Sequence, residues 1–311
     1  MTLIVLLCGC GDIAYDMPYD SGAGVSGFNI INNVDDGSQV SSFASSLCIA
    51  NVDILDEEDM SKVEAAALFD LNANNVLYSK NAHERLYPAS LTKIMTALVA
   101  LKYGTLDQML VATDAVNITE SGAQLSGVKS GDKMTLDQAL HALLMYSAND
   151  VAMLIAENIG GSVEEFVAMM NQEAVRLGAT NTHFVNPHGL TDVDHYTTVY
   201  DLYLIFNEAI KYDVINEIIH MTSYQSTYFD KNGAEKELSF GTTNRYLKET
   251  VAVPANVTII GGKTGTTSAA GHCLIILSKN ASGAPFISVI LRSESTDLLY
   301  EKMNHLLEKI Q

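Results

Sequence analysis

The chain has 311 residues, of which 48% are hydrophobic and 18% charged, as is usual for a soluble globular protein of one or two domains. Its formal net charge is −19 at pH 7, and its pI is near 4.6. Because phosphate binding requires a basic surface, this charge argues against nucleic acid as a partner.

The first ten residues suggest export. Residues 2–7 are apolar and uncharged, and they are too few to span a bilayer. They are typical of the end of the hydrophobic region of a secretory signal, although the basic region that normally comes first is missing. Leu7-Cys8-Gly9-Cys10 resembles a bacterial lipobox, in which Cys10 would carry a lipid. An ordinary cleaved signal is the alternative, and both interpretations predict an exported protein.

A long spacer is expected next. Residues 11–46 are rich in Gly, Ser, Asn and Asp and show no helical or strand period, which predicts a flexible tether. Residues 53–59 are acidic and are expected to lie outside the folded body. The predicted organisation is a signal or lipobox remnant at 1–10, a spacer at 11–60 and one folded domain at 61–311.

The folded domain is expected to begin with a hairpin and a buried helix. Residues 63–70 form an apolar strand, turn residues follow, and 76–79 return as its partner. A mostly apolar run at 91–101 ends before Gly104, as expected for a helix C-terminus. A helix that is apolar on nearly all sides is buried. Ser90 is placed in its first turn.

The middle of the domain is predicted to be a helical block from residue 135 to residue 177. A capping box at 135–138 begins a helix that runs to about residue 146. Residues 147–149 interrupt the pattern and are expected in an interhelix loop. The helical period then resumes, and a second capping box at 162–165 begins the last helix of the block.

The remaining segments complete a mixed fold. They are predicted helices at 198–211 and 214–221, strands at 257–266, 273–279 and 286–291, and a closing helix at 296–310. Strands at both ends of the domain with helices between them indicate the α+β class. We expect one antiparallel sheet, whose two halves meet in space, with a mostly helical lobe beside it.

The cysteines indicate neither a metal site nor a disulfide framework. Cys8, Cys10, Cys48 and Cys273 have spacings that fit neither pattern. Cys273 lies in an apolar run, which favours a small buried core residue over a reactive thiol. No metal or organic cofactor is expected.

Ser90 and Lys93 are the first candidate catalytic pair. A serine hydroxyl is a poor nucleophile near neutral pH and needs a neighbouring base. Residues three apart on a helix share a face, and burial lowers the pKa of a lysine toward the working range. A neutral Lys93 could then accept the proton of Ser90. The alternative is a serine cap beside a solvated lysine, and the buried character of the helix favours the catalytic interpretation.

Two further motifs indicate an active site only in combination with this pair. Ser147-Ala148-Asn149 could supply a hydroxyl for proton relay and an amide for substrate binding, although such residues are also ordinary turn formers. Lys263-Thr264-Gly265 could bind a substrate carboxylate beside a strand, because glycine allows close approach to the backbone. A glycine-rich turn is the alternative for this segment.

With all three motifs present, the chain resembles the penicillin-recognising serine enzymes. It is most similar to the D-alanyl-D-alanine carboxypeptidases among the low-molecular-mass penicillin-binding proteins, from about Val63 onward. Residues 88–96 (Pro-Ala-Ser-Leu-Thr-Lys-Ile-Met-Thr) resemble the nucleophile segment of that family. Residues 184–190 (Phe-Val-Asn-Pro-His-Gly-Leu) and 262–265 (Gly-Lys-Thr-Gly), with Ala-Gly at 270–271, are also typical of it.

The resemblance implies a β-lactamase/transpeptidase-like fold and a role for each matching residue. Ser90 would be the acylated nucleophile and Lys93 its base, and Ser147 and Asn149 would serve proton relay and substrate binding. Lys263, Thr264 and Gly265 would line the substrate strand, and the backbone N–H groups of Ser90 and Thr266 would form the oxyanion hole. His188 lies in a family motif, but the resemblance gives it no chemical role.

The implied activity is removal of the terminal D-alanine from peptidoglycan stem peptides, with β-lactams as covalent inhibitors. Its expected place is the outer face of the bacterial cytoplasmic membrane or the cell wall. Better-known family members carry a second, β-rich domain and a terminal amphipathic anchor helix, for which residues 61–311 leave no room. A lipid on Cys10 would supply the anchor and would be the sole membrane contact.

Two rival functions use the same scaffold. A class A β-lactamase needs a deacylating glutamate, followed by Leu-Asn, in a loop between the second and third motifs. Residues 184–190 occupy that stretch here and contain no glutamate. A non-catalytic β-lactam sensor or wall-binding module is the other rival. Sensors usually carry a membrane-spanning signalling segment, and we find no apolar run of that length.

Overall fold

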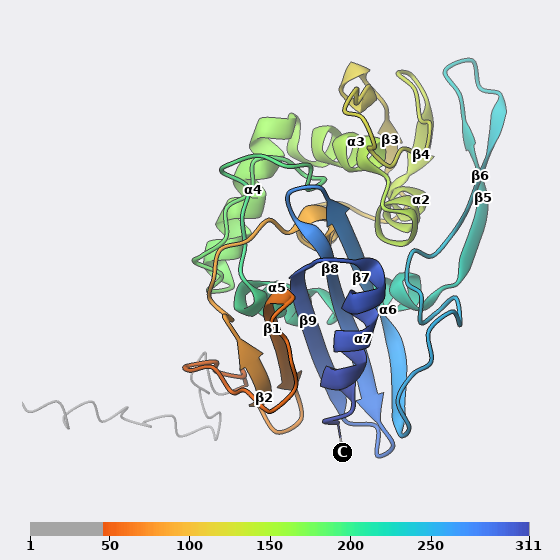
Figure 1. Ribbon diagram of the computed structural model, residues 1–311. Coiled ribbons are helices and arrows are strands. Elements are labelled where there is room, and N and C mark those ends of the chain that lie inside the picture. Colours follow the sequence, from red (N-terminus) through yellow and green to blue (C-terminus); the bar gives the residue numbers. More distant parts are fainter. Residues whose placement is uncertain (1–45, 311) are drawn as a thin grey trace, which may run out of the picture. The chain divides into compact units, whose positions relative to one another are not determined.

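The structure is a computed structural model that describes residues 46–310 (Figure 1). The predictions for the signal or lipobox at 1–10, for Cys10 and for the spacer up to residue 45 lie outside these residues. Within 46–310, no helix is both long and apolar enough to cross a membrane.

A five-stranded antiparallel sheet joins the two ends of the described chain. Its spatial order is β2-β1-β9-β8-β7. The strands are β1 (Val63–Asp70), β2 (Asn75–Lys80), β7 (Val257–Thr267), β8 (Gly271–Asn280) and β9 (Pro285–Ser293). Strands β1 and β9 pair from Val63 opposite Ser293 to Asp70 opposite Phe286. The predicted meeting of early and late strands in one sheet is therefore confirmed.

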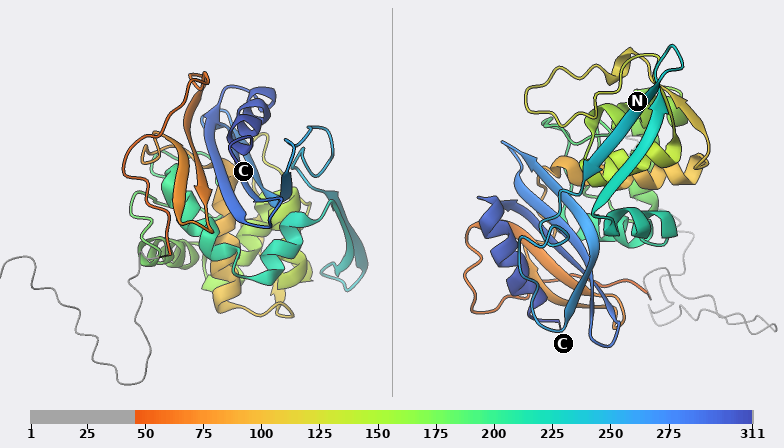
Figure 2. Two further views of the ribbon diagram at one scale, coloured as in Figure 1. Left: turned by 90° about the horizontal axis from the view of Figure 1, so that it is seen from below. Right: turned by 90° about the vertical axis from the view of Figure 1, so that its right-hand side faces the viewer.

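Both faces of this sheet are covered. The closing helix α7 (Thr296–Leu307) lies against one face, and α5 (Val199–Ala209) packs against the other (Figures 1 and 2). Because side chains alternate along a strand, Ala67 and Phe69 of β1 join the core on the α5 side, whereas Leu68 joins the core under α7. The ring of Phe69 stacks on Tyr203 of α5 with centroids 4.1 Å apart.

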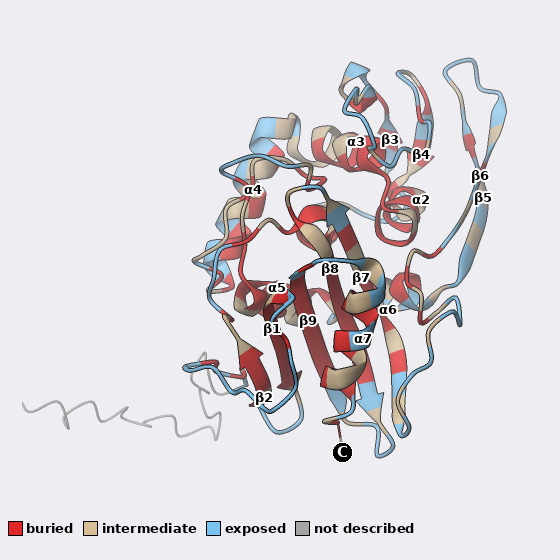
Figure 3. Cartoon of the chain, in the orientation of Figure 1, coloured by how far each residue is buried: buried red, intermediate tan, exposed pale blue. Residues whose placement is uncertain are grey.

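The helical lobe surrounds one buried helix. The elements are α1 (Thr92–Tyr103), α2 (Leu136–His141) with a π turn at Ala142–Tyr146, α3 (Asn149–Gly160) and α4 (Val163–Arg176). Most residues of β8 and β9 are buried (red in Figure 3), and so is every residue of α1 from 92 to 100. This confirms the prediction made from its apolar sequence, and it places Lys93 inside the protein.

The predicted helix starts are confirmed, with small shifts. Thr135 and Gln138 form a reciprocal capping box, and the side chain of Ser162 accepts from Glu165 N. Ser90 precedes α1 rather than lying in it, because it occupies a short 3₁₀ turn at Ala89–Leu91. The interhelix loop is shorter than expected, since Asn149 is already the first residue of α3.

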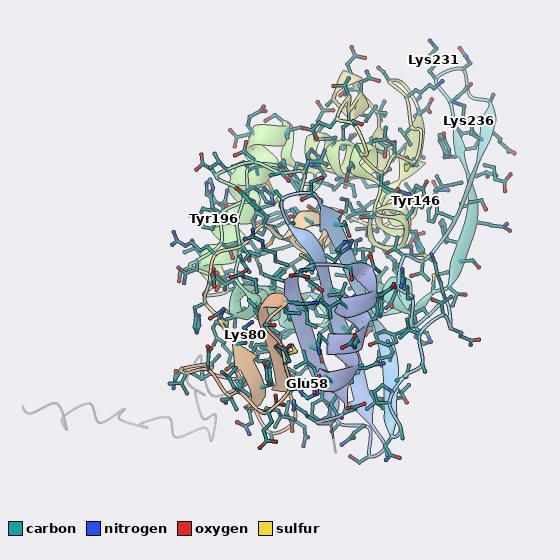
Figure 4. All side chains as sticks on the ribbon, in the orientation of Figure 1. Glu58, Lys80, Tyr146, Tyr196, Lys231 and Lys236 are labelled. Carbon is teal, nitrogen blue, oxygen red and sulfur yellow. The ribbon has the colours of Figure 1, made fainter. Side chains whose placement is uncertain are left out.

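A second sheet was not predicted from the sequence. Its order is β3-β4-β5-β6, from β3 (Met109–Val111), β4 (Lys133–Thr135), β5 (Ser223–Phe229) and β6 (Glu235–Gly241). The hairpin β5–β6 extends from the lobe, with Lys231 and Lys236 near its free end (Figure 4). Burial alternates along both strands, but the less exposed positions are held by Tyr224, Tyr228, Leu238 and Phe240 among polar residues, so no apolar run marked these strands in the sequence. The helix α6 (Asp213–His220) packs against β7.

The expected spacer boundary at residue 60 lies too late in the chain. Cys48 and Met60 are buried, and Ile54 forms a bridge with Ser79 of β2. The acidic run 53–59 packs on α7, where Asp56 contacts His305 and Lys309, and Glu58 lies 2.9 Å from Lys302 (Glu58 is labelled in Figure 4). Complementary charge on α7 therefore holds a segment whose composition alone suggested disorder.

This docking predicts a loss of stability when the segment is removed. A chain that starts at residue 61 should have a free energy of unfolding about 3–5 kcal/mol lower than one that starts at residue 46, because it loses three buried side chains: Cys48, Ala50 and Met60. Urea denaturation of both chains measures the difference. Asp56→Asn in the longer chain keeps these side chains and should lose less, whereas equal stability of the two chains would contradict the docking.

Candidate active site

The three sequence motifs converge on one cavity. Ser90, Ser147, Asn149 and Thr264–Thr266 all line a space of about 430 Å³ between the sheet and the helical lobe. Ser90 comes from the turn before α1, Ser147 and Asn149 from the start of α3, and Thr264 from β7. Segments that are 116 residues apart in sequence meet directly here, since Lys263 Nζ lies 2.9 Å from Ser147 Oγ.

Ser90 is held by close backbone packing. The preceding Ala89 has φ 48°, a left-handed conformation that is strained for a residue with a Cβ. A Cβ on Gly265 would lie 3.0 Å from Ser90 N, and one on Gly189 would lie 1.9 Å from Ala89 O. The glycine of the third motif is therefore needed for the strand to lie against the nucleophile turn, as the sequence suggested.

Lys93 Nζ has three oxygen neighbours. It lies 2.6 Å from Asn149 Oδ1, 2.6 Å from the carbonyl oxygen of His188 and 3.0 Å from Ser90 Oγ. An ammonium would donate to all three oxygens, whereas a neutral amine has two N–H donors and one lone pair. In the neutral form the two carbonyl oxygens, which can only accept, use both donors, and the lone pair is left for the hydroxyl proton of Ser90.

Burial keeps this amine neutral. Lys93 is fully buried, and desolvation together with the charge of Lys263 lowers its pKa well below the ordinary value, although Asp150 opposes this shift. Desolvation also lowers the pKa of Lys263 to about 7. Two ammonium groups so close together in a buried site repel each other. We therefore assign the neutral form to Lys93 and the greater share of positive charge to Lys263.

The second motif connects the two lysines. Ser147 lies in a left-handed conformation with φ 71°, which ends the π turn and directs its hydroxyl to Lys263 Nζ. Asn149 accepts from Lys93 through Oδ1, so its Nδ2 group remains a donor on the cavity side. In the described part of the chain, the Ser147 hydroxyl therefore bonds to Lys263. The sequence predicted this hydroxyl beside Lys93 instead.

A buried histidine supports the nucleophile turn and was missed in the sequence. Val185 N donates to His195 Nδ1 over 3.2 Å, so Nε2 carries the proton and donates to Thr92 Oγ1 over 2.8 Å. Thr92 in turn donates to Ala89 O over 2.9 Å. This chain of bonds holds the strained Ala89 carbonyl. Burial lowers the pKa of His195 to about 4, which keeps the required neutral tautomer.

His188 contributes through its backbone. Its carbonyl oxygen is one of the two acceptors of Lys93, and its ring Nδ1 accepts from Leu190 N. Burial lowers the pKa of its imidazole to about 3. The sequence motif at 184–190 therefore shapes the loop that presents a carbonyl to the base, a role that a sequence cannot show.

Asp150 anchors a loop beside the cavity and was also missed. Its carboxylate accepts from Ser126 N at 3.0 Å and from Gly127 N at 2.8 Å, while Asn149 N donates to Gln124 O. The loop is thus fixed to the first turn of α3, where the backbone N–H groups favour a carboxylate. This places Gln124 on the cavity wall.

Arg245 supplies a cation to the same cavity. It follows β6 and lines the space with Thr243, whose hydroxyl lies 2.6 Å from Thr264 Oγ1. Its guanidinium pairs with Asp297 at 2.6 Å and lies over the ring of Tyr300. Nothing in the local sequence identifies Arg245, because only the folded chain brings it next to the third motif.

These features define a serine acyl-transfer site in which a buried lysine is the base and a glycine-containing strand is the substrate platform. The comparisons agree. Residues 54–295 match the family Peptidase_S11, D-alanyl-D-alanine carboxypeptidase. The chain therefore belongs to the D-alanyl-D-alanine carboxypeptidase family Peptidase_S11.

Curated relatives and solved structures are similar over most of the described chain. D-alanyl-D-alanine carboxypeptidase DacF of Bacillus subtilis is 36% identical over 228 residues, which cover 71% of this chain and 55% of that protein. DacC of Escherichia coli is 32% identical over 250 residues, covering 77% and 59%. The chain thus spans between half and three fifths of these relatives. The crystal structure of the Streptomyces K15 DD-transpeptidase superposes with a TM-score of 0.75 at 26% identity, covering 82% of this chain and 98% of that one.

The expected β-lactamase/transpeptidase-like α+β fold is thereby confirmed. The rival functions gain no support from the cavity. Among the described residues that line it there is no aspartate or glutamate. The stretch 184–190 instead provides the carbonyl that binds Lys93, so a class A deacylation arrangement is not favoured.

The close contact between Gly189 and Ala89 predicts that adding one methyl group at position 189 strongly destabilises the fold. Gly189→Ala should lower the free energy of unfolding by about 3 kcal/mol or more and should disturb Ser90, because its Cβ would collide with Ala89 O. Gly161→Ala is the matched control, since Gly161 has a similar positive φ but no atom within 4 Å of the added Cβ. It should cost only about 1 kcal/mol. Equal losses in urea denaturation would contradict the close contact.

The depressed pKa of His195 predicts acid sensitivity. Its folded pKa of about 4 lies below the ordinary 6.5, so the unfolded chain binds the proton more readily between these values. Stability should be full above about pH 6.5 and should fall by about 3 kcal/mol as the pH drops to about 4. His195→Gln should be less stable at pH 7 but should lose less over this interval. Urea denaturation at both pH values checks this, and an unchanged pH slope in the variant would contradict it.

Proposed function

We propose that the chain is a serine-type D-Ala-D-Ala carboxypeptidase that removes the terminal D-alanine from peptidoglycan stem peptides through an acyl-enzyme on Ser90. The observation that carries this proposal is the contact of Ser90 Oγ with a buried Lys93 amine whose two N–H donors already have fixed acceptors. Residues 46–310 are the catalytic domain of this proposal. The names of the relatives and the K15 neighbour support the substrate class.

Acylation begins with transfer of the Ser90 proton to Lys93 Nζ as Ser90 Oγ attacks the carbonyl carbon of the penultimate D-alanine. The carbonyl π bond becomes an oxyanion, which accepts from the backbone N–H groups of Ser90 and Thr266. Both residues line the cavity. Substrate laid along β7 would bring its scissile carbonyl between them.

Collapse of this intermediate breaks the bond to the leaving D-alanine. Its nitrogen takes the proton that Lys93 received, and we assign the relay to Ser147, which lines the same cavity as Ser90 and whose Oγ lies 2.9 Å from Lys263 Nζ. Water then attacks the acyl-enzyme carbonyl. Lys93 accepts one water proton and returns it to Ser90 Oγ as the ester bond breaks, so the serine is restored and the shortened peptide forms as a carboxylic acid, which loses the second water proton to solvent and leaves as a carboxylate.

The leaving end of the substrate carries a carboxylate, and one side of the cavity suits that charge. Thr264 and Arg245 line this side, the buried Lys263 donates from Nζ to Thr264 O over 3.0 Å, and Asn149 is available to bind the substrate amide through Nδ2. Cation and hydroxyl donors together favour a terminal carboxylate over an amide or a continuing peptide. This arrangement accounts for carboxypeptidase rather than endopeptidase action.

β-Lactams should acylate the same serine and leave slowly. No carboxylate among the described residues of the cavity is placed to activate a deacylating water. The substrate is outside the cytoplasm, which agrees with the apolar residues 2–7. We therefore propose an exported enzyme at the membrane surface or in the wall, with a lipid on Cys10 as its anchor.

Two substitutions test the mechanism. Ser90→Ala should abolish covalent labelling by a fluorescent penicillin and lower D-alanine release by about 10⁴-fold or more. Lys93→Met keeps the chain length but cannot accept a proton, so it should lower the acylation rate by about 10³-fold. Release of D-alanine from diacetyl-L-lysyl-D-Ala-D-Ala and the mass of the intact penicillin adduct are the measurements.

The control is Lys248→Met, which changes an exposed lysine outside the cavity and should leave both rates unchanged. Thermal melting of each variant shows whether the fold is kept. Persistent penicillin labelling of Ser90→Ala would mean that the nucleophile is misassigned. Rapid turnover of penicillin, with no release of D-alanine from the peptide, would favour the β-lactamase alternative.

A further inference from the structure

A second groove continues the catalytic cavity along the chain. It has a volume of about 530 Å³ and shares four lining residues with that cavity, namely Gly122, Leu190, Thr266 and Thr267. Because both spaces include these residues, a molecule bound over Ser90 can extend into the groove without crossing a wall. The groove is therefore within reach of a substrate bound at Ser90.

Glu120 is the charged residue of this groove. The other lining side chains are small, aliphatic or hydroxyl-bearing: Ser121, Gly122, Leu190, Thr191, Thr266, Thr267, Ser268 and Ala269. Glu120 is exposed, and no cation of residues 46–310 forms an ion pair with it. Its carboxylate thus presents an uncompensated negative charge to whatever enters the groove.

Both walls of the groove are fixed in position. Ala123 N donates to Glu120 O, and the same loop is anchored to α3 by the Asp150 carboxylate and by Gln124 O. On the other wall, Thr191 Oγ1 donates to Thr267 Oγ1 over 3.1 Å. The carboxylate of Glu120 is therefore carried by a segment tied to the first turn of α3.

The direction of the substrate follows from β7. The carboxylate-binding groups lie around Thr264 and Arg245, whereas the groove starts at Thr266 and continues through Thr267 to Ala269. With the terminal carboxylate at Thr264, the residue before the two D-alanines lies on the groove side of Ser90. One residue spans about 3.3–3.6 Å, so this residue and its long side chain reach the groove rather than the catalytic cavity.

We propose that Glu120 binds the side-chain ammonium group of the diamino acid that precedes D-Ala-D-Ala in the stem peptide. This inference rests on the function proposed above and adds its substrate preference. The groove selects peptides whose side-chain amine is free and charged over peptides in which that amine has been converted to an amide. A cross-linked stem peptide carries such an amide, so uncross-linked strands are the preferred substrate class.

A matched pair of peptides tests this preference. Nα-acetyl-L-lysyl-D-Ala-D-Ala and its Nα,Nε-diacetyl counterpart differ in the charge on one amine. With the native chain at low ionic strength, the free-amine peptide should show a kcat/KM about fivefold higher. In Glu120→Gln the ratio of the two kcat/KM values should fall to about one, and in Glu120→Lys it should fall below one. Added salt should reduce the native ratio.

Glu217→Gln is the control, because it removes one exposed carboxylate of α6 outside both cavities and should keep the native ratio. A native ratio that survives in Glu120→Gln would show that the size of the acetyl group, and not charge, causes it, and would overturn the inference. Equal kcat/KM values with the native chain would also overturn it while leaving the proposed function intact. Absence of D-alanine release from both peptides would overturn both proposals.

Discussion

The site depends on one desolvated amine. Desolvation makes an ammonium group costly to bury, so it lowers the pKa of Lys93, against the opposing charge of Asp150. The neutral amine that this favours gives its two N–H donors to Asn149 and His188. The same desolvation turns it into a base for Ser90. Desolvation of Lys93 is therefore the cause of both its neutral form and its reactivity as a base. Each element that excludes water from this amine helps to lower its pKa.

Backbone strain is concentrated around that amine. Ala89 and Ser147, which flank the nucleophile and begin the α3 loop, both have positive φ values. Each is held by several independent contacts: Ala89 by Gly189 and by the bonds through Thr92 and His195, and Ser147 by Lys263. Strained backbone persists only where several surrounding contacts hold it in place. Here those contacts fix the hydroxyl groups of Ser90 and Ser147 in one cavity.

Charge across the cavity is arranged along the direction of β7. Cationic groups, Lys263 and Arg245, lie at the end where a carboxylate is expected, while Glu120 lies in the groove beyond Thr266. Between them the described lining residues are neutral, so the scissile bond is placed in a region where backbone dipoles dominate. The net charge of −19 does not reveal this arrangement of charges along β7, because most of the acidic residues are on the solvated surface.

The sequence by itself determined the outline of this protein. Apolar period identified β1, α1, β7, β8, β9 and α7, capping boxes placed the starts of α2 and α4, and three motifs marked residues from Ser90 to Gly265 that do line one cavity. These signals are local, since a cap or an apolar stripe is decided by residues a few positions apart.

Only the tertiary structure decided the rest. The β5–β6 hairpin, the packing of the acidic run 53–59 on α7, and the roles of His195, Asp150, Arg245 and Glu120 were not predicted from the sequence. The structure also shows which residue of the second motif contacts which lysine: Ser147 accepts from Lys263, and Asn149 accepts from Lys93. The physical reason is that burial, charge pairing and hydrogen bonding depend on neighbours in space, and here those neighbours are up to about 250 residues apart in the chain, as Asp56 and Lys309 are.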